Sequence, residues 1–295
     1  GLRHYCMGLA NVSKGEMMKN TLGLAIACMC LAMISAVTAF AAPKTNQIRI
    51  QYVPPKEQNH MPTYEFLQER RVLERLQEFL SPFLLPRTLD IKVAGCDGEA
   101  DAFYGDDEIT ICYEYVDDLF GKMPDKTTPS GIAPYDTVAG PFFDTCLHEF
   151  AHALFDMFSL PILGRQEDAA DQVAAYIYLQ LGPVESLRLI KGTAYAFKAE
   201  ADSKGMPVLS DDHGTPRQRA YNVLCIAYGA DEEVFSEIVS GGYLPMKRAE
   251  NCAEEYEQVQ DAFEELISPQ IDRDLAKKVL NDFWLSGSDT EVPRQ

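Results

Sequence analysis

The sequence predicts an α+β fold, with a small mixed sheet in the N-terminal part followed by a mostly helical C-terminal part. Three segments before residue 115 alternate polar and apolar residues, as half-buried strands do. From Pro141 onward the apolar residues recur at helical spacing almost to the end of the chain, and no internal repeat is present. Strands followed by helices, rather than alternating with them, indicate this fold class.

The three expected strands are 47–53, 88–94 and 108–114, which together predict one small sheet. An amphipathic helix is expected over 64–79, where the apolar side chains form one stripe. The acidic stretch 97–108 is interpreted as a hairpin that Cys96 and Cys112 close. The helices expected in the C-terminal part are 141–158, 165–181, 184–202, 214–228, 232–240, 246–267 and a shorter one near 271–283.

The first 41 residues have the pattern of a targeting segment rather than of a folded domain. Lys19 precedes an uncharged apolar run, which ends at the small-residue sequence Ala39-Phe40-Ala41. This order is typical of a signal peptide, so we expect 1–41 to be a signal peptide with an upstream extension, cleaved near Ala41/Ala42. The alternative is an uncleaved membrane anchor, since the run is nearly long enough to span. Residues 42–295 are expected to form a single domain in a periplasmic or secreted protein.

The net charge narrows the classes of partner that the protein can bind. The formal net charge of −19 disfavours binding to phosphate backbones, so no nucleic-acid partner is expected, and contact with a membrane is expected only through an uncleaved leader. The sequence says nothing about the oligomeric state.

Five cysteines follow the leader, and an oxidising compartment permits disulfides among them. We predict the pairs Cys96–Cys112 and Cys225–Cys252, with Cys146 left as a buried free thiol.

The stretch Cys146-Leu-His-Glu-Phe-Ala-His152 carries the strongest chemical pattern, H-E-x-x-H. On a helix, residues four apart lie on one face, so His148 and His152 can hold the same zinc ion. Glu149 can then face a zinc-bound water as the general base. A catalytic zinc site needs three protein ligands and one open position, so a third ligand is expected elsewhere in the chain.

The third ligand is expected on the next helix. A third histidine soon after the motif is one common solution, but Phe155 and Phe158 occupy the positions where the glycine and that histidine would stand. Glu167 is therefore predicted as the ligand, with Asp168 as the alternative if the helix is rotated. Asp171 shares a face with Glu167 and is predicted to accept the outer N–H of His148.

His213 is a second candidate for catalysis, as a donor to the oxyanion that develops during hydrolysis. Asp211 or Asp212 could orient its ring, because the sequence Asp211-Asp-His-Gly214 stands just before an expected helix. Tyr221 and Arg217 are alternatives for the same role. An exposed histidine in a helix-capping loop is an equally good interpretation of this position.

The motif together with Glu167-x-x-x-Asp171 resembles the gluzincin pattern of thermolysin-like peptidases, although only fourteen residues separate His152 from Glu167, fewer than in those enzymes. Most of the chain after residue 42 is more similar to the bacterial family described as "putative metallopeptidase". Stretches that carry this resemblance are Ala102-Phe-Tyr104 with 109–114, the His148 motif, 164–172, 218–225 with 228–229, and 248–252 with 255–256. The resemblance implies a zincin-like fold, a bound zinc ion and a peptide or protein substrate. By analogy with that fold, the strand 108–114 is expected at the sheet edge, where an extended substrate could pair with it.

These observations lead to one function and two alternatives. The chain is predicted to be an exported zinc-dependent metallopeptidase that hydrolyses peptide bonds through a zinc-activated water, with Zn²⁺ as its cofactor. A non-catalytic zinc-binding domain on a peptidase fold is the first alternative, although such a domain has no need of Glu149. A zinc hydrolase of a non-peptide amide, such as a cell-wall component, is the second.

Overall fold

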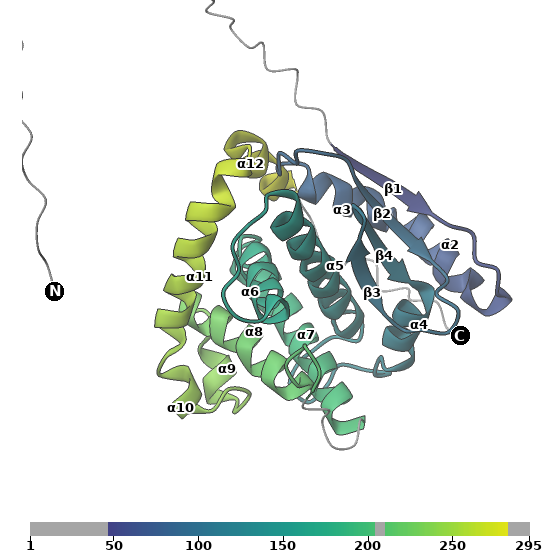
Figure 1. Ribbon diagram of the computed structural model, residues 1–295. Helices are drawn as coiled ribbons and strands as arrows, with labels where there is room; N and C mark the ends of the chain where they lie inside the picture. The colour runs from purple at the N-terminus through teal and green to yellow at the C-terminus, as the bar shows by residue number, and fades with distance from the viewer. Residues whose placement is uncertain (1–46, 204–209, 283–295) are drawn as a thin grey trace, which may run out of the picture. The chain divides into compact units, whose positions relative to one another are not determined.

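A four-stranded sheet and a larger group of helices make up the protein in a computed structural model, which describes residues 47–203 and 210–282. The sheet and the helices that cover it lie on one side, and the remaining helices pack beside them around α5, Asp136–Met157 (Figure 1). The α+β class, with a small mixed sheet before a mostly helical part, is confirmed. The targeting segment expected at 1–41 lies outside the described residues.

The sheet has the strand order β1-β2-β4-β3. The strands β1 (Ile48–Tyr52), β2 (Leu89–Ala94) and β4 (Glu108–Cys112) are parallel neighbours, and β3 (Ala102–Gly105) is antiparallel to β4. The expectation that the strand near 108–114 forms the sheet edge is wrong, because β3 pairs with β4 on that side. The short strand β3 is therefore the edge strand at this end of the sheet.

The hairpin between β3 and β4 agrees with the interpretation of the acidic stretch. Asp106 and Asp107 both adopt positive φ angles, 53° and 62°, as the two central residues of a tight hairpin turn do. Aspartate tolerates this left-handed conformation better than most residues. A disulfide between Cys96 and Cys112 joins the start of this segment to the end of β4, as predicted.

The N-terminal helices differ from the expectation in two places. The helix expected over 64–79 is divided into α2 (Met61–Glu69) and α3 (Val72–Leu80), because Arg71 between them adopts a left-handed conformation with φ 53°. The strand expected to reach residue 114 ends at Cys112, where α4 (Tyr113–Gly121) begins. In α4 the buried residues Tyr113, Val116 and Leu119 recur every three residues, so one helical face is covered.

The helical part contains the expected succession of helices after α5. The long ones are α6 (Gln166–Leu179), α7 (Pro183–Ser203), α8 (Pro216–Ala230) and α11 (Cys252–Leu266), with the short α9 (Ser236–Ser240), α10 (Met246–Ala249) and α12 (Arg273–Asp282) between or after them. The helix expected over 246–267 is divided into α10 and α11. The predicted disulfide Cys225–Cys252 joins α8 to α11, and Cys146 is a buried free thiol.

Two glycines allow α5 and α7 to pack backbone against backbone. A Cβ atom added to Gly192 would lie 1.9 Å from the carbonyl oxygen of Asp136, and one added to Gly140 would lie 2.5 Å from that of Leu189. Neither distance is compatible with a side chain. This close contact lies at the N-terminal end of α5 and sets the position from which the helix continues toward the H-E-x-x-H residues.

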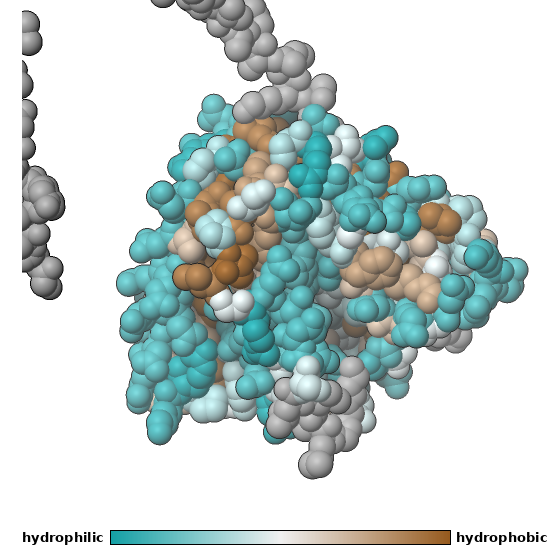
Figure 2. Space-filling view, in the orientation of Figure 1, coloured by the Kyte–Doolittle hydropathy of each residue, from teal (hydrophilic) through white to brown (hydrophobic). Residues whose placement is uncertain are grey.

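The surface drawn in Figure 2 is mostly hydrophilic, and apolar side chains gather on it beside α11. An apolar groove of about 210 Å³ lies there, lined by residues of the 160–163 loop, α6 and α11. Leu163 is almost fully exposed beside it. Within the described residues, no helix combines the length and apolar character needed to cross a membrane.

Candidate metal centre

The two motif histidines lie one turn apart on α5 and face the same point. His148 Nε2 lies 3.1 Å from His152 Nε2. Helical spacing explains why the two rings are close, since side chains four positions apart are neighbours on the helix surface. The helix is buried along most of its length: His148 is only 3% exposed, while Phe150, Ala151, Ala153 and Leu154 between and beyond the histidines are fully buried.

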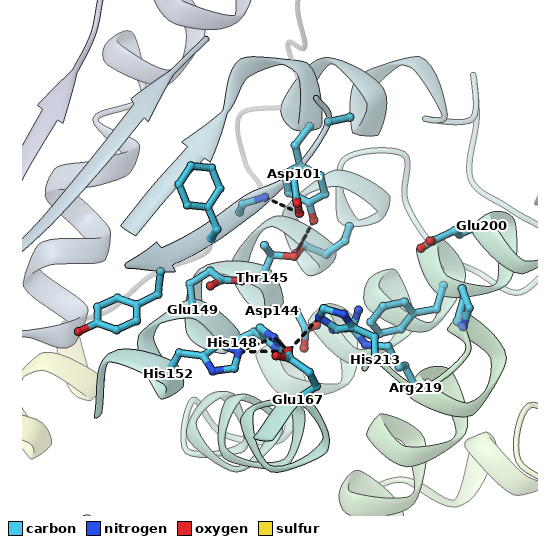
Figure 3. Close-up of a pocket in the computed structure, with 18 of the residues that line it drawn as sticks. Asp101, Asp144, Thr145, His148, Glu149, His152, Glu167, Glu200, His213 and Arg219 are labelled. Carbon is cyan, nitrogen blue, oxygen red and sulfur yellow. Dashed lines mark hydrogen bonds and ion pairs between the residues drawn. The ribbon is translucent and has the colours of Figure 1, made fainter. Parts of the chain in front are cut away.

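Glu167 of α6 brings a carboxylate to both imidazoles. Its Oε2 lies 3.0 Å from His148 Nε2 and 3.2 Å from His152 Nε2 (Figure 3). Asp168, the other acid considered for this place, bonds instead to Arg165, with 3.0 Å between its Oδ2 and Arg165 Nε. Of the two adjacent acids, only Glu167 therefore stands at the histidine pair.

Asp171 occupies the predicted place behind His148. Its Oδ1 lies 2.7 Å from His148 Nδ1, and the aspartate is 4% exposed. An ionised carboxylate can only accept, so Nδ1 carries a proton, and Nε2 is the nitrogen whose lone pair a cation would bind. Burial opposes a charge on His148, but its bonds to Asp171 and Glu167 raise its pKa to about 9, so without a cation Nε2 carries a proton too and donates to Glu167. Asp171 lies one helical turn after Glu167, so α6 presents both carboxylates to the same imidazole.

His213 approaches the same centre from the loop before α8. Its Nε2 lies 2.9 Å from Glu167 Oε2, and its ring stacks against that of His148 with centroids 5.7 Å apart. Its Nδ1 lies 3.4 Å from Asp211 Oδ1 and 3.6 Å from Asp212 Oδ1. His213 is thus near the predicted ligands while remaining 42% exposed on its side chain. Arg217 bonds to Asp202, away from this cluster.

The residues fit a zinc ion. Ligand atoms about 2.0–2.1 Å from a tetrahedral zinc lie about 3.3 Å from one another, close to the separations among His148 Nε2, His152 Nε2 and Glu167 Oε2. The Nε2 of His148 and the Glu167 carboxylate face each other at 3.0 Å, and both can act as acceptors. Such an arrangement needs a proton or a cation between them, and nitrogen with carboxylate oxygen is a donor set that zinc accepts.

The electrostatics of the cluster favour a positive charge. The hydrogen bond from His148, together with the neighbouring imidazoles, lowers the pKa of Glu167 to about 2 although partial burial opposes this. Burial also opposes ionisation of Asp171, but its bonds to His148 and Arg219 hold its pKa well below the usual range. Burial and the nearby His148 lower the pKa of His152, which keeps that imidazole neutral and able to donate a lone pair. Two ionised carboxylates and a neutral imidazole are what a divalent cation requires.

Glu149 lies between the histidine pair and the edge strand. The backbone N–H of Tyr104 in β3 donates to its carboxylate, and the residue is 7% exposed. Burial raises the pKa of Glu149 to about 7, which suits a group that must both accept and return a proton near neutral pH.

A large cleft opens over this centre. Its volume is about 1670 Å³, more than a small-molecule pocket usually has. Residues of β3 and the 99–107 segment line one side, and residues of α7 and the 211–217 loop line the other. The four candidates His148, Glu149, His152 and Glu167 all lie in its lining. An extended chain can therefore reach the centre between the two walls.

Two further residues near the centre were absent from the sequence-based prediction. Arg219 of α8 bonds to Asp171, and Asp144 lies on α5 four residues before His148. The spacing of Asp144 puts it on the same helical face as the motif, which is a signal the sequence contains. Nothing in the sequence pairs Arg219 with Asp171, because these residues are 48 positions apart.

Comparison with known proteins agrees with this site. The family model described as "Putative metallopeptidase" matches residues 52–267. The chain belongs to this family. The matched region includes every candidate residue from β3 to α8, and membership supports a metal-dependent, peptidase-like function. No curated protein and no solved structure matches the chain.

Proposed function

We propose that the protein is an exported zinc-dependent metallopeptidase, whose single domain of residues 42–295 follows a cleaved signal peptide. The observation that carries the proposal is the convergence of His148 Nε2, His152 Nε2 and Glu167 Oε2 within 3.2 Å of one another, beside Glu149 and under an open cleft. The two disulfides are consistent with an oxidising compartment outside the cytoplasm.

In this proposal His148, His152 and Glu167 hold the ion. Zinc, when bound, supplies Lewis acidity, which polarises a substrate carbonyl and acidifies water. Asp171 keeps His148 in the tautomer whose Nε2 can ligate, by accepting the Nδ1 proton. These contacts support a centre that is arranged before any substrate arrives.

Glu149 performs the proton transfers. As general base it accepts a proton from the attacking water, and as general acid it later returns that proton to the leaving amine. Its raised pKa supports both steps, since neither form is strongly disfavoured near neutral pH. His213 is proposed as a donor to the oxyanion: its ring lies at the mouth of the centre, and Asp211 and Asp212 flank its Nδ1.

The edge strand β3 is proposed to align the substrate. Strand β3 lines the cleft and has β4 on one side only, so its other edge is available to an extended peptide. Pairing with β3 would bring a peptide bond next to Glu149, because Tyr104 of this strand already donates to that carboxylate. This geometry favours a peptide or protein substrate over a compact small molecule.

The decisive experiment combines metal analysis with a peptide-library cleavage assay, with and without a chelator, on the chain that begins at Ala42. We expect one zinc per chain and cleavage that the chelator abolishes. Glu149→Gln should retain zinc and lose about 10²–10⁴-fold in kcat, because only the base is removed.

Glu114→Gln is the matched control, since Glu114 has a side chain 10% exposed and lies outside the cleft lining. It should keep wild-type turnover. Wild-type turnover in Glu149→Gln contradicts the proposed mechanism. One zinc per chain without cleavage of any peptide contradicts peptidase activity and favours a non-catalytic domain or a hydrolase of another amide.

A further inference from the structure

Arg219 of α8 holds the carboxylate that orients His148. Its Nε donates to Asp171 Oδ2 at 2.8 Å and its Nη2 donates to Asp171 Oδ1 at 2.7 Å. The second of these oxygens is the one that accepts from His148 Nδ1, also at 2.7 Å. The guanidinium, the carboxylate and the imidazole thus form a continuous chain from α8 through α6 to α5. A paired, two-bond contact of this kind fixes direction as well as distance.

The guanidinium has little freedom to turn. Its central carbon lies 4.6 Å from the centroid of the Phe197 ring, on α7, so the plane of the guanidinium is held by an aromatic face as well as by Asp171. The side chain is 18% exposed. A capping box formed by Thr215 and Gln218 starts α8 one turn before Arg219, which fixes the direction from which the arginine enters.

A second buried carboxylate makes the positive charge of Arg219 more important. Asp144 is 2% exposed, and its Oδ1 has no hydrogen-bond partner within the described residues. Burial raises the pKa of Asp144 to about 7; the charge of Asp171 also raises this pKa, and the charge of Arg219 lowers it. The charge of Arg219 thus acts on both buried aspartates, and its side chain bonds to Asp171. Without Arg219, Asp171 would keep only its hydrogen bond to His148 among the described residues.

We propose that Arg219 is a positioning residue of the metal site. It fixes Asp171 at the orientation in which Oδ1 accepts from His148 Nδ1, and so directs His148 Nε2 at the ion. This inference rests on the zinc site of the proposed function and adds a residue to it from a third helix, α8. Outer partners of metal-ligating histidines typically contribute about 10–100-fold to metal affinity, although they never touch the metal.

The test measures zinc affinity by competition with a chelator of known affinity, and the absorption spectrum of the cobalt-substituted protein, in the chain that begins at Ala42. We expect Arg219→Gln to bind zinc about 10–100-fold more weakly and to change the cobalt spectrum, because the coordination of His148 changes. Arg219→Lys should recover part of the loss, since lysine restores the charge and one bond but not the paired contact.

Arg188→Gln is the matched control. Arg188 forms a comparably buried pair with Asp136, with side chains 20% and 10% exposed, at the far end of α5 from the motif. It should lower stability while leaving zinc affinity and the cobalt spectrum unchanged. If Arg188→Gln weakens zinc binding as much as Arg219→Gln does, the effect is general destabilisation and the inference is overturned.

A double variant covers the case in which Arg219→Gln does not fold. Asp144→Asn combined with Arg219→Gln removes a buried carboxyl group together with the guanidinium, so Asp171 loses its two bonds to Arg219 while Asp144 is no longer a buried acid without that cation. Weak zinc binding in the folded double variant supports the inference, and wild-type affinity overturns it. Absence of zinc from the wild-type protein would contradict the proposed function itself, a result distinct from equal affinity in wild type and variants.

Discussion

The sheet region, from β1 to α4, and the helical region, from α5 to α11, contribute to the candidate centre in different ways. All the proposed ligands and the residues that orient them come from α5, α6, α8 and the loop before α8. The sheet region supplies no proposed ligand; its part is the wall formed by β3, which contacts Glu149 through the backbone of Tyr104. In the proposed site, helices thus supply the ligands, while a strand edge is available to the substrate.

This difference has a physical reason. A ligand must be held within a fraction of an ångström, and side chains on packed helices with hydrogen-bonded partners meet that requirement. A substrate backbone needs a row of main-chain donors and acceptors, which an edge strand offers and a helix does not. Substitutions in the helical region should therefore change metal binding, and substitutions in the sheet region should change substrate binding.

The largest effect is expected in the helical region from Glu167→Gln, with the adjacent Asp168→Asn as control. Loss of a residue that hydrogen-bonds to a ligand weakens metal binding by up to about 100-fold, and loss of a ligand itself should weaken zinc binding by more than that. Turnover should be lost with the zinc. Asp168 pairs with the exposed Arg165, so its substitution should leave zinc bound, since exposed pairs contribute little. The measurement is the zinc content of both variants. Loss of zinc from Asp168→Asn alone would make Asp168, rather than Glu167, the third ligand.

The pH dependence of kcat/KM tests Glu149, the residue at which the two regions meet. Glu149 acts as a base only when deprotonated, so kcat/KM should fall about tenfold per unit as the pH decreases through its pKa. Burial raises that pKa from 4.5 toward about 7, and a bound cation acts in the opposite direction. The acid limb should therefore lie between these values. A profile that stays flat down to pH 4.5 would remove Glu149 as the base.

The smallest effect is expected in the sheet region, from Phe103→Ala in β3. Phe103 is 50% exposed and lines the cleft, so its removal takes apolar surface from the substrate wall. We expect KM to rise by up to about tenfold, because part of one aromatic contact is lost, with kcat and zinc content unchanged. Val184→Ala, at an exposed position outside the cleft lining, should change none of these quantities. A change in zinc content in Phe103→Ala would contradict the division between the two regions.

Much of the fold could be predicted from local patterns, and the exceptions are informative. Strand β3 escaped prediction because it has four residues, too few for alternation to be recognised. The break at Arg71 escaped because a left-handed non-glycine residue has no reliable local signal. Both predicted disulfides formed, one of them closing the hairpin that contains β3. The two features that were not predicted, strand β3 and the break at Arg71, are local geometry that tertiary packing imposes.

The sequence by itself determined the relation between His148, Glu149 and His152, because helical geometry alone sets which side chains share a face. It also placed Glu167 and Asp171 one turn apart on the next helix, but it left Asp168 open as an alternative. Only the tertiary structure decided which of the two acids meets the histidines, that His213 joins them, and that Arg219 holds Asp171. These contacts depend on how separate helices pack, and packing depends on side chains along the whole length of each helix.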